Sequence, residues 1–529
     1  MAEAIHPVKK TLIIVSAVLA LLGAGGLLVV RDLLAPSTGG AVVVYCAAGF
    51  KTPVEVVAAQ FKTETGVEVQ LQYGGTATLL SAIQTARRGD LFLAADSIAI
   101  EEGRRQRLLR EVIPVALQRP VLAVPKGNPK QLTTLESIQA EGVRLALTNP
   151  ESAAVGRITK SVLGDRYEAL ASRAIVTKPT VNDIASDLSL GAVDAAIVWD
   201  STVAQFPNLE AVQLPVLSEN LESASIAVLS ASTQSPAALR FARYLAAPDR
   251  GGKILQEMGF TPTAGDRWTP TPELVLYSGG VNRPAIESLL HDFSEREGVR
   301  VTTVFNGCGV LCASMKAMAD STDPKFPDAY YACDLCFVPP VAKFFPETLV
   351  LTETEIGVAV KKGNPAGIAS VADLARPGLR VGLCNAEQST LGFMTRGILS
   401  TIDMVEAVQK NVAVEVPTAD FLINQLRAGA LDAAIVYKVN AIPQQEHLDF
   451  LPIGHPGARA VQPFSIRADS PNRHLADRLL EFLREHRSRF EAAGFQWRGE
   501  EVKIESAKIE VPEWLRPNKD QKASPAEHP

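Results

Sequence analysis

The sequence predicts an α/β protein in which one folding unit occurs twice in tandem. Segments that are apolar or alternate in polarity, as strands do, take turns with segments of helical periodicity, and this order is typical of a parallel sheet with crossover helices. The same order returns in the second half of the chain with closely matching residues, which indicates an internal repeat. A chain of 529 residues is also too long for one hydrophobic core, so we expect more than one domain.

The first unit is expected to open with alternating strands and helices. A buried strand is expected over 41–45 and a helix over 53–65, followed by an alternating strand over 67–71. A second helix over 78–87 and a third strand over 90–95 continue the pattern. We therefore expect these strands to form a parallel sheet with helices on its faces.

Two pairs of segments show the repeat most clearly. Residues 358–365 match residues 122–129, and residues 429–437 match residues 191–199, where both copies read Gly-Ala-x-Asp-Ala-Ala-Ile-Val followed by an aromatic residue. The predicted boundaries are 1–40 for a cytoplasmic stub, membrane anchor and linker, 41–262 for the first unit, 273–498 for the second unit, and 499–529 for a charged, flexible tail.

A membrane anchor is expected before the first unit. The segment from Leu12 to Val30 is almost purely apolar and approaches the roughly 20 residues that a membrane-spanning helix needs. Lys9 and Lys10 precede it, so the positive-inside rule keeps the N-terminus in the cytoplasm and places the rest on the extracytoplasmic side. A cleaved signal peptide is the alternative, but no small-residue cleavage site closely follows the apolar segment. We expect a single-pass protein of the cell membrane.

Charge and composition exclude several functional classes. The chain has 52 basic and 58 acidic side chains, a net charge of −6, and no block of basic residues, so nucleic acid is not an expected partner. It also shows no set of nucleophile, base and orienting group and no glycine-rich loop that would hold a phosphate. We therefore do not expect an enzyme.

Three sequence features resemble a known family. They are the Tyr-Gly-Gly-Thr-Ala-Thr-Leu loop over 73–79, the strand end over 90–96, and the repeated run over 191–199 and 429–437. In these residues the chain resembles the type II periplasmic solute-binding proteins, and most closely their molybdate-binding branch. The resemblance covers both units. It implies two Rossmann-like α/β lobes per unit that close on a small inorganic ligand, and an ABC-type permease in the membrane as partner.

The expected ligand sites lie in loops that follow strands, since ligands bind outside the carboxyl ends of strands in open α/β sheets. By the resemblance, oxyanions are held by hydroxyl groups and by backbone N–H groups at helix N-termini, where the helix dipole favours negative charge. Trp199 takes the place of a hinge tyrosine that Tyr437 keeps. The candidate ligand-binding residues are Cys46, Thr76, Thr78, Asp96 and Trp199 in the first unit, and Ser278, Cys308, Asp334, Ser389, Thr390 and Tyr437 in the second.

Some of these residues have a second interpretation. Asp96 and Asp334 end equivalent strands, where capping of the next helix is the more common role. Gly49 and Val281 stand where the resemblance leads us to expect a serine, so the ligand stays open between a molybdate-like oxyanion and a soft metal or metalloid species. No cofactor is expected with certainty. The first unit has few hydroxyls in its loops and is the better candidate for a degenerate copy.

Five of the six cysteines belong to the second unit: Cys308, Cys312, Cys333, Cys336 and Cys384. Disulfides are one interpretation, because the extracytoplasmic side is oxidising. A soft-metal site is a second, because thiolates select such ions. Redox exchange through Cys333-x-x-Cys336 is a third. The alternative to a solute receptor is therefore a thiol-redox, metal-handling or sensor protein that uses these cysteines.

Overall fold

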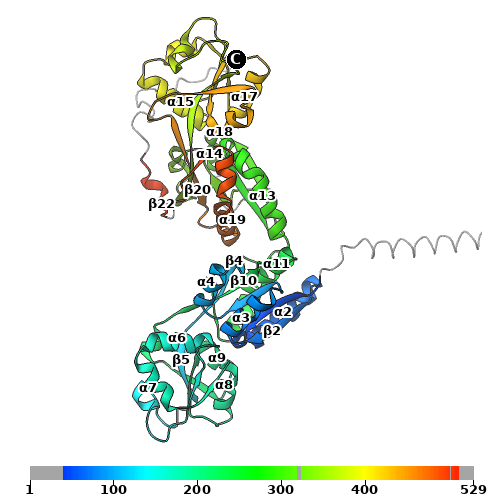
Figure 1. Ribbon diagram of the computed structural model, residues 1–529, viewed down its shortest axis with the longest axis vertical. Helices are drawn as coiled ribbons and strands as arrows, with labels where there is room; N and C mark the ends of the chain where they lie inside the picture. Colours follow the sequence, from blue (N-terminus) through cyan, green and yellow to red (C-terminus); the bar gives the residue numbers. More distant parts are fainter. Residues whose placement is uncertain (1–39, 319–322, 324, 501, 511–529) are drawn as a thin grey trace, which may run out of the picture. The chain divides into compact units, whose positions relative to one another are not determined.

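The computed structural model describes residues 40–318, 323, 325–500 and 502–510. The chain divides into two compact units between Ala264 and Gly265, drawn from blue to green and from green to red in Figure 1. The predicted membrane anchor over 12–30 lies outside the described residues. Among the residues that are described, no helix has the length and apolar character needed to cross a bilayer.

The first lobe of the first unit is built on a six-stranded sheet. Its strands, in spatial order, are β11 (Thr261–Pro262), β4 (Leu109–Gln118), β10 (Glu222–Leu229), β3 (Leu91–Ala94), β1 (Val42–Ala47) and β2 (Val69–Gly74). Its helices are α2 (Lys51–Thr65), α3 (Thr76–Ala86), α4 (Ser97–Arg105), α11 (Ser235–Ala246) and α12 (Gly251–Glu257). The predicted strands and helices are all present, with ends shifted by up to three residues.

The second lobe of the first unit has a five-stranded sheet. In spatial order its strands are β7 (Ala174–Lys178), β6 (Leu145–Thr148), β8 (Ala195–Trp199), β5 (Pro120–Pro125) and β9 (Leu209–Val212). Its helices are α5 (Leu135–Ile138), α6 (Ala154–Leu163), α7 (Arg166–Arg173), α8 (Val181–Ser189), α9 (Asp200–Ala204) and α10 (Pro215–Ser218). Figure 1 shows α6 to α9 grouped around β5, apart from the group that holds α2, α3 and α4.

The sheet of the first lobe is parallel only in the part that was predicted. β1 pairs in parallel with both β2 and β3, as expected, but β10 pairs antiparallel with β3 and β4. The chain leaves the first lobe along β4 and returns along β10, so these two strands run in opposite directions. The sheet is therefore mixed.

The second unit repeats this plan with its two lobes joined by one long strand. The spatial order is β13 (Arg300–Asn306), β12 (Glu273–Gly279), β14 (Ala329–Tyr331), β20 (Arg459–Ile466), β15 (Glu347–Lys361), β18 (Ala433–Tyr437), β16 (Val381–Cys384) and β17 (Val412–Val416), and β19 (Leu448–Pro452), β21 (Gln496–Trp497) and β22 (Ile504–Glu505) also pair with β15. Its helices are α13 (Arg283–Glu297), α14 (Cys308–Ala317), α19 (Arg473–Glu485) and α20 (Arg487–Ala492) in the first lobe, and α15 (Thr390–Thr401), α16 (Val405–Gln409), α17 (Ala419–Arg427) and α18 (Lys438–Ala441) in the second.

Strands β8 and β18 are the repeated Ala-Ala-Ile-Val-aromatic runs. Every residue of both strands is buried, because helices cover both faces of the sheets that contain them. This explains why the two runs are continuously apolar rather than alternating. Their last residues, Trp199 and Tyr437, end at the edge of the sheet that faces the first lobe.

The beginning of the predicted flexible tail is structured. β22 pairs with the start of β15, and the backbone N–H of Ser506 donates to Pro346 O over 2.8 Å. Ser506 is fully buried. Residues 502–510 therefore pack against the second unit.

Candidate functional site

Helices that begin in or after the loops at strand ends bring the candidate residues to the cleft of each unit. In the first unit α3 begins at Thr76 and α6 at Ala154, and in the second α14 begins at Cys308 and α15 at Thr390. Each N-terminus presents backbone N–H groups that the helix itself leaves unpaired. The two lobes of a unit therefore face each other with helix N-termini.

The cleft of the first unit contains a small hollow with an apolar lining. The predicted loops contribute the residues Ala47, Ala48, Gly49, Gly74, Gly75, Thr76, Ala95, Ala153, Ala154 and Trp199, and Thr180 and Val181 complete it. Its two hydroxyls already have partners: Thr76 accepts from Ala95 N over 3.4 Å, and Thr180 donates to Asp183 over 2.7 Å. Both lining hydroxyls therefore make hydrogen bonds within the protein.

The lobes of the first unit are held together by direct contacts. Asp96, whose side chain is fully buried, forms an ion pair with Arg157 of α6 in the second lobe. Asn182 donates to Ala48 O over 3.0 Å, and Ala77 N donates to Ser152 O over 3.1 Å. The first unit is therefore closed by its own side chains.

The remaining predicted residues of the first unit do not line the hollow. The Cys46 thiol is buried and donates to Ala47 O over 3.6 Å, and burial raises its pKa above the ordinary value. Thr78 is exposed. Asp96 caps α4 by accepting from Ala99 N over 3.0 Å, as the capping interpretation predicted. Thr76 and Trp199 are the predicted residues that reach the hollow.

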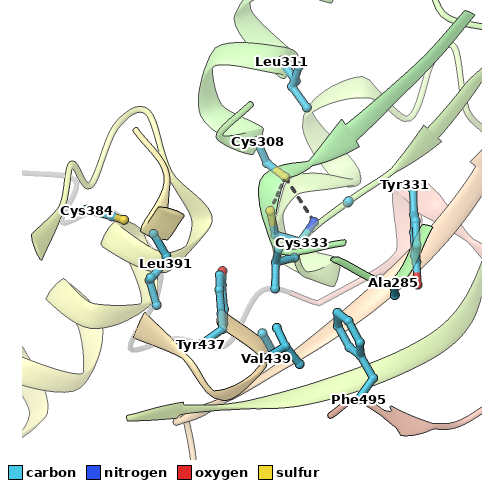
Figure 2. Packing of buried hydrophobic residues seen from close by; sticks show 14 of the residues in the cluster. Ala285, Cys308, Leu311, Tyr331, Cys333, Cys384, Leu391, Tyr437, Val439 and Phe495 are labelled. Carbon is cyan, nitrogen blue, oxygen red and sulfur yellow. Dashed lines mark hydrogen bonds between the residues drawn. The ribbon is translucent and has the colours of Figure 1, made fainter. Parts of the chain in front are cut away.

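A pair of buried thiols lies where the two lobes of the second unit meet (Figure 2). The sulfurs of Cys308 and Cys333 lie 3.0 Å apart, and the Cys333 N–H donates to the Cys308 sulfur over 3.1 Å. Cys308 thus makes the same contact that Thr76 makes with Ala95 in the first unit. Burial raises the pKa of Cys308, but hydrogen bonds, first of all from Cys333, outweigh burial and hold it below the ordinary value. Its hydrogen bond to Cys308, together with burial, raises the pKa of Cys333 well above the ordinary value.

Two hydroxyls of the second lobe face this pair. The oxygens of Thr390 and Tyr437 are both buried. The Tyr437 hydroxyl has no hydrogen-bond partner among the described residues, while the Thr390 hydroxyl lies beside the Cys308 and Cys333 sulfurs. Figure 2 shows the Tyr437 hydroxyl pointing to the side on which the two thiols lie. Burial raises the pKa of Tyr437, and the nearby thiols Cys333 and Cys308 raise it further. The first unit has Ala154 and Trp199 at these positions, so this pair of hydroxyls is specific to the second unit.

The comparison with known families covers both units. Residues 42–261 and 274–496 each match the family described as bacterial extracellular solute-binding protein. The chain belongs to this family. The match confirms the predicted tandem repeat and the resemblance to type II periplasmic binding proteins.

Individual relatives of this solute-binding protein match about one unit or less. A Haemophilus influenzae protein with the general name of a binding protein is 28% identical over 159 residues, which are 30% of this chain and 65% of that protein. Molybdate-binding protein ModA of Mycobacterium bovis is 23% identical over 229 residues, 42% of this chain and 86% of that protein. Among solved structures, the periplasmic molybdate-binding protein of Azotobacter vinelandii is 19% identical, with a TM-score of 0.37, 42% of this chain covered and 100% of the other.

The other candidate residues of the solute-binding protein's second unit have structural roles. Ser278 is buried and donates to Gly279 O over 3.3 Å. Asp334 accepts from Cys336 N over 3.0 Å and Val461 N over 2.8 Å, and burial raises its pKa. Ser389 is the N-cap residue of α15 but makes no side-chain cap bond. Its hydroxyl lies beside Cys384, whose pKa burial raises to about 12.

The cysteines do not form the predicted metal centre. All six lie within the described residues, and none is in a disulfide. Cys312 lies against Tyr330 OH and Phe337 O, and Cys384 belongs to β16 in the other lobe. In the described part of the chain, no group of three or more cysteine, histidine, aspartate or glutamate residues is placed to hold a metal ion.

The structure brings Cys333 to Cys308 rather than to Cys336, the residue that the Cys-x-x-Cys interpretation paired with it. Cys333 meets Cys308, while the backbone at Cys336 is held by the Asp334 cap. Spacing along the chain favoured Cys336 as the partner of Cys333, but the contacting cysteine is Cys308 of α14, 25 residues earlier. The Asp96–Arg157 ion pair was also missed, because nothing in the sequence links residues 61 positions apart.

Proposed function

We propose that this protein is an extracytoplasmic receptor of an ABC-type importer and that its second unit captures a small, molybdate-like oxyanion by lobe closure. The observation that carries the proposal is the buried Tyr437 hydroxyl, which has no partner among the described residues, together with the buried Thr390 hydroxyl in the same lobe. Buried polar groups almost always have a partner, and leaving one without costs about 1–3 kcal/mol. An oxyanion between the lobes would accept from both hydroxyls.

The helix that carries Thr390 supports an anionic ligand. α15 has 12 residues, and its N-terminal N–H groups and helix dipole favour negative charge. Closure would be stabilised because such a ligand contacts both lobes only in the closed state. The molybdate-binding proteins among the relatives agree with this ligand class.

The first unit is proposed to be a degenerate copy. Its lobes are joined by the Asp96–Arg157 ion pair, so closure there does not require a ligand. A permease partner in the membrane and the single-pass anchor over 12–30 belong to the same proposal. They rest on the family and on the apolar N-terminal segment.

Isothermal titration calorimetry of the full-length chain with molybdate, tungstate, sulfate and phosphate tests the proposal. We expect one equivalent of at least one of these anions to bind, and Thr390→Ala to weaken binding at least tenfold, about 1.4 kcal/mol. The matched control is Thr76→Ala in the first unit, which should leave binding unchanged. Absence of binding by all four anions, or binding that survives Thr390→Ala, would contradict the proposal.

A further inference from the structure

The second unit's cleft contains two thiols that oxyanion capture does not require. Cys308 is fully buried and Cys333 is 4% exposed, and their sulfurs lie 3.0 Å apart. A disulfide bond is about 2.05 Å long, so the sulfurs need to approach by only about 1 Å to be joined. Of the other cysteines in the second unit, Cys312 contacts Tyr330 OH over 3.7 Å and Cys384 lies in the other lobe.

The backbone at the end of β12 is adapted to this pair. A Cβ atom on Gly279 would overlap the Cys333 sulfur and lie 3.2 Å from the Cys308 sulfur. Glycine at this position therefore leaves room for both sulfurs in the same place. The equivalent strand end of the first unit has Ala47 and no thiol pair beside it.

The Cys308 sulfur lies where the proposed oxyanion would bind. It lies at the first residue of α14, it accepts a hydrogen bond from the Cys333 N–H over 3.1 Å, and it lies 3.0 Å from the Cys333 sulfur. The Thr390 hydroxyl lies close to both sulfurs. An electron-rich sulfur here competes with an oxyanion for these donors and repels its charge. Joining the two sulfurs would remove that competition.

We propose that Cys308 and Cys333 form a reversible disulfide and that the second unit binds its oxyanion more tightly in the disulfide state than in the dithiol state. The second half of this inference rests on the proposed function. A low-molecular-weight disulfide is the oxidant. The Cys308 thiolate attacks one of its sulfurs and displaces the first thiolate, and Cys333, losing its proton, then attacks the Cys308 sulfur and displaces the second. Two cysteine thiols are oxidised to one disulfide, and one disulfide is reduced to two small thiols.

Exchange takes place when the lobes open. In the closed unit, Val310 N of α14 donates to Gln388 O of the second lobe over 3.3 Å, and the loop that carries Gln388 covers the N-terminus of α14. Opening moves this loop away and admits the oxidant. Closure over an oxyanion then follows with the Cys308 sulfur held in the disulfide.

The first test maps the disulfide. Full-length protein is equilibrated with oxidised or reduced glutathione, free thiols are alkylated, and the cross-linked peptides are identified by mass spectrometry. We expect oxidised glutathione to remove two of the six thiols, to join Cys308 to Cys333, and to be reversed by dithiothreitol. A different cross-link, or six free thiols after oxidation, would overturn the inference.

The second test measures molybdate binding by calorimetry in both redox states. We expect at least tenfold tighter binding after oxidation, and no redox dependence in Cys308→Ser or Cys333→Ser. Cys46→Ser, a buried cysteine of the first unit, is the matched control and should keep the full dependence. Equal affinity in both states, or tighter binding in the dithiol state, would overturn the inference that the disulfide strengthens oxyanion binding. A correct cross-link together with no binding in either state would contradict the oxyanion function and leave the disulfide established by the first test.

Discussion

At the scale of single residues, removal of the Tyr437 hydroxyl should change ligand affinity and protein stability in different directions. It is buried without a partner, so Tyr437→Phe removes an unsatisfied group and leaves the ring in place. We expect the ligand-free stability to stay the same or rise by about 1 kcal/mol, because the desolvation penalty disappears. Oxyanion affinity should fall by roughly 10- to 100-fold, since a hydrogen bond to a charged group contributes about 1.5–3 kcal/mol. Urea unfolding and calorimetric titration measure the two quantities.

A neighbouring tyrosine offers the matched control. The hydroxyl of Tyr331 is also buried, but it lies 3.1 Å from Thr352 Oγ1 in a hydrogen bond. Tyr331→Phe should therefore cost about 1 kcal/mol of stability and leave affinity unchanged. If Tyr437→Phe behaved like this control, the Tyr437 hydroxyl would have no role in ligand capture.

The Asp96–Arg157 ion pair is the residue-scale prediction for the first unit. Arg157→Ala leaves the fully buried Asp96 carboxylate without its cation, and breaking such a pair typically costs about 3–5 kcal/mol. Denaturant unfolding of the full chain should show this loss in the first unit. Lys62→Ala, which removes an exposed pair with Glu68, should cost less than about 1 kcal/mol. A similar small loss for Arg157→Ala would show that Asp96 is not held by this contact.

The residues that sequence patterns could identify are those placed by local rules. Thr76 and Thr390 begin helices after loops that follow strands, and Tyr437 ends a strand, so the strand-end rule put them at the cleft. The Cys308–Cys333 contact depends on how α14 packs beside β14, and no local pattern encodes that packing. Thr78 was misplaced for a related reason: two residues further along a helix, a side chain turns to another face.

At the scale of elements, strand and helix order followed from periodicity, but strand direction did not. Periodicity reports which face of a segment is buried, and it is the same for parallel and antiparallel strands. The direction of β10 depends on the return of the chain from the second lobe. The prediction that each unit closes two lobes on a ligand therefore depended on the family resemblance alone.

Equivalent ion pairs join the strands of each second lobe and give a pH prediction. Arg144 binds Asp194 over 2.7 Å, and Arg380 binds Asp432 over 2.8 Å. These hydrogen bonds hold the pKa of both carboxyls below the ordinary value of about 3.9. Because the folded-state pKa is the lower one, the stabilisation is present above about pH 4 and is lost as pH falls through the folded-state pKa.

Asp432→Asn should therefore destabilise the protein at pH 7 and have a smaller effect at pH 3. Urea unfolding at the two pH values measures the difference. Asp292→Asn, on an exposed face of α13, is the control and should change stability little at either pH. An equal effect of Asp432→Asn at both pH values would show that the ion pair does not account for the stabilisation.

At the scale of the whole molecule, the two copies keep one plan but differ in what closes them. In each unit an ion pair lies where the chain crosses to the second lobe. It joins Arg119 to Asp200 at 3.8 Å in the first unit and Glu355 to Lys438 at 2.8 Å in the second, so the positive and negative residues have exchanged positions. Each copy thus keeps an ion pair with its own side chains. The Asp96–Arg157 closure has no such counterpart, since Phe393 takes the place of Arg157 and packs against Phe337.

Because the lobes of the first unit are joined by an ion pair that the second unit lacks, we expect a ligand to stabilise the second unit alone. A two-domain chain need not unfold in one step, so differential scanning calorimetry should resolve a transition for each unit. At a free molybdate concentration of 100 times Kd, the second unit should gain about 2.7 kcal/mol, while the transition of the first unit stays in place. Arg157→Ala identifies the first unit's transition, because that substitution should lower it alone. A ligand-induced shift of the transition that Arg157→Ala lowers would place the working site in the first unit and reverse the assignment of the degenerate copy.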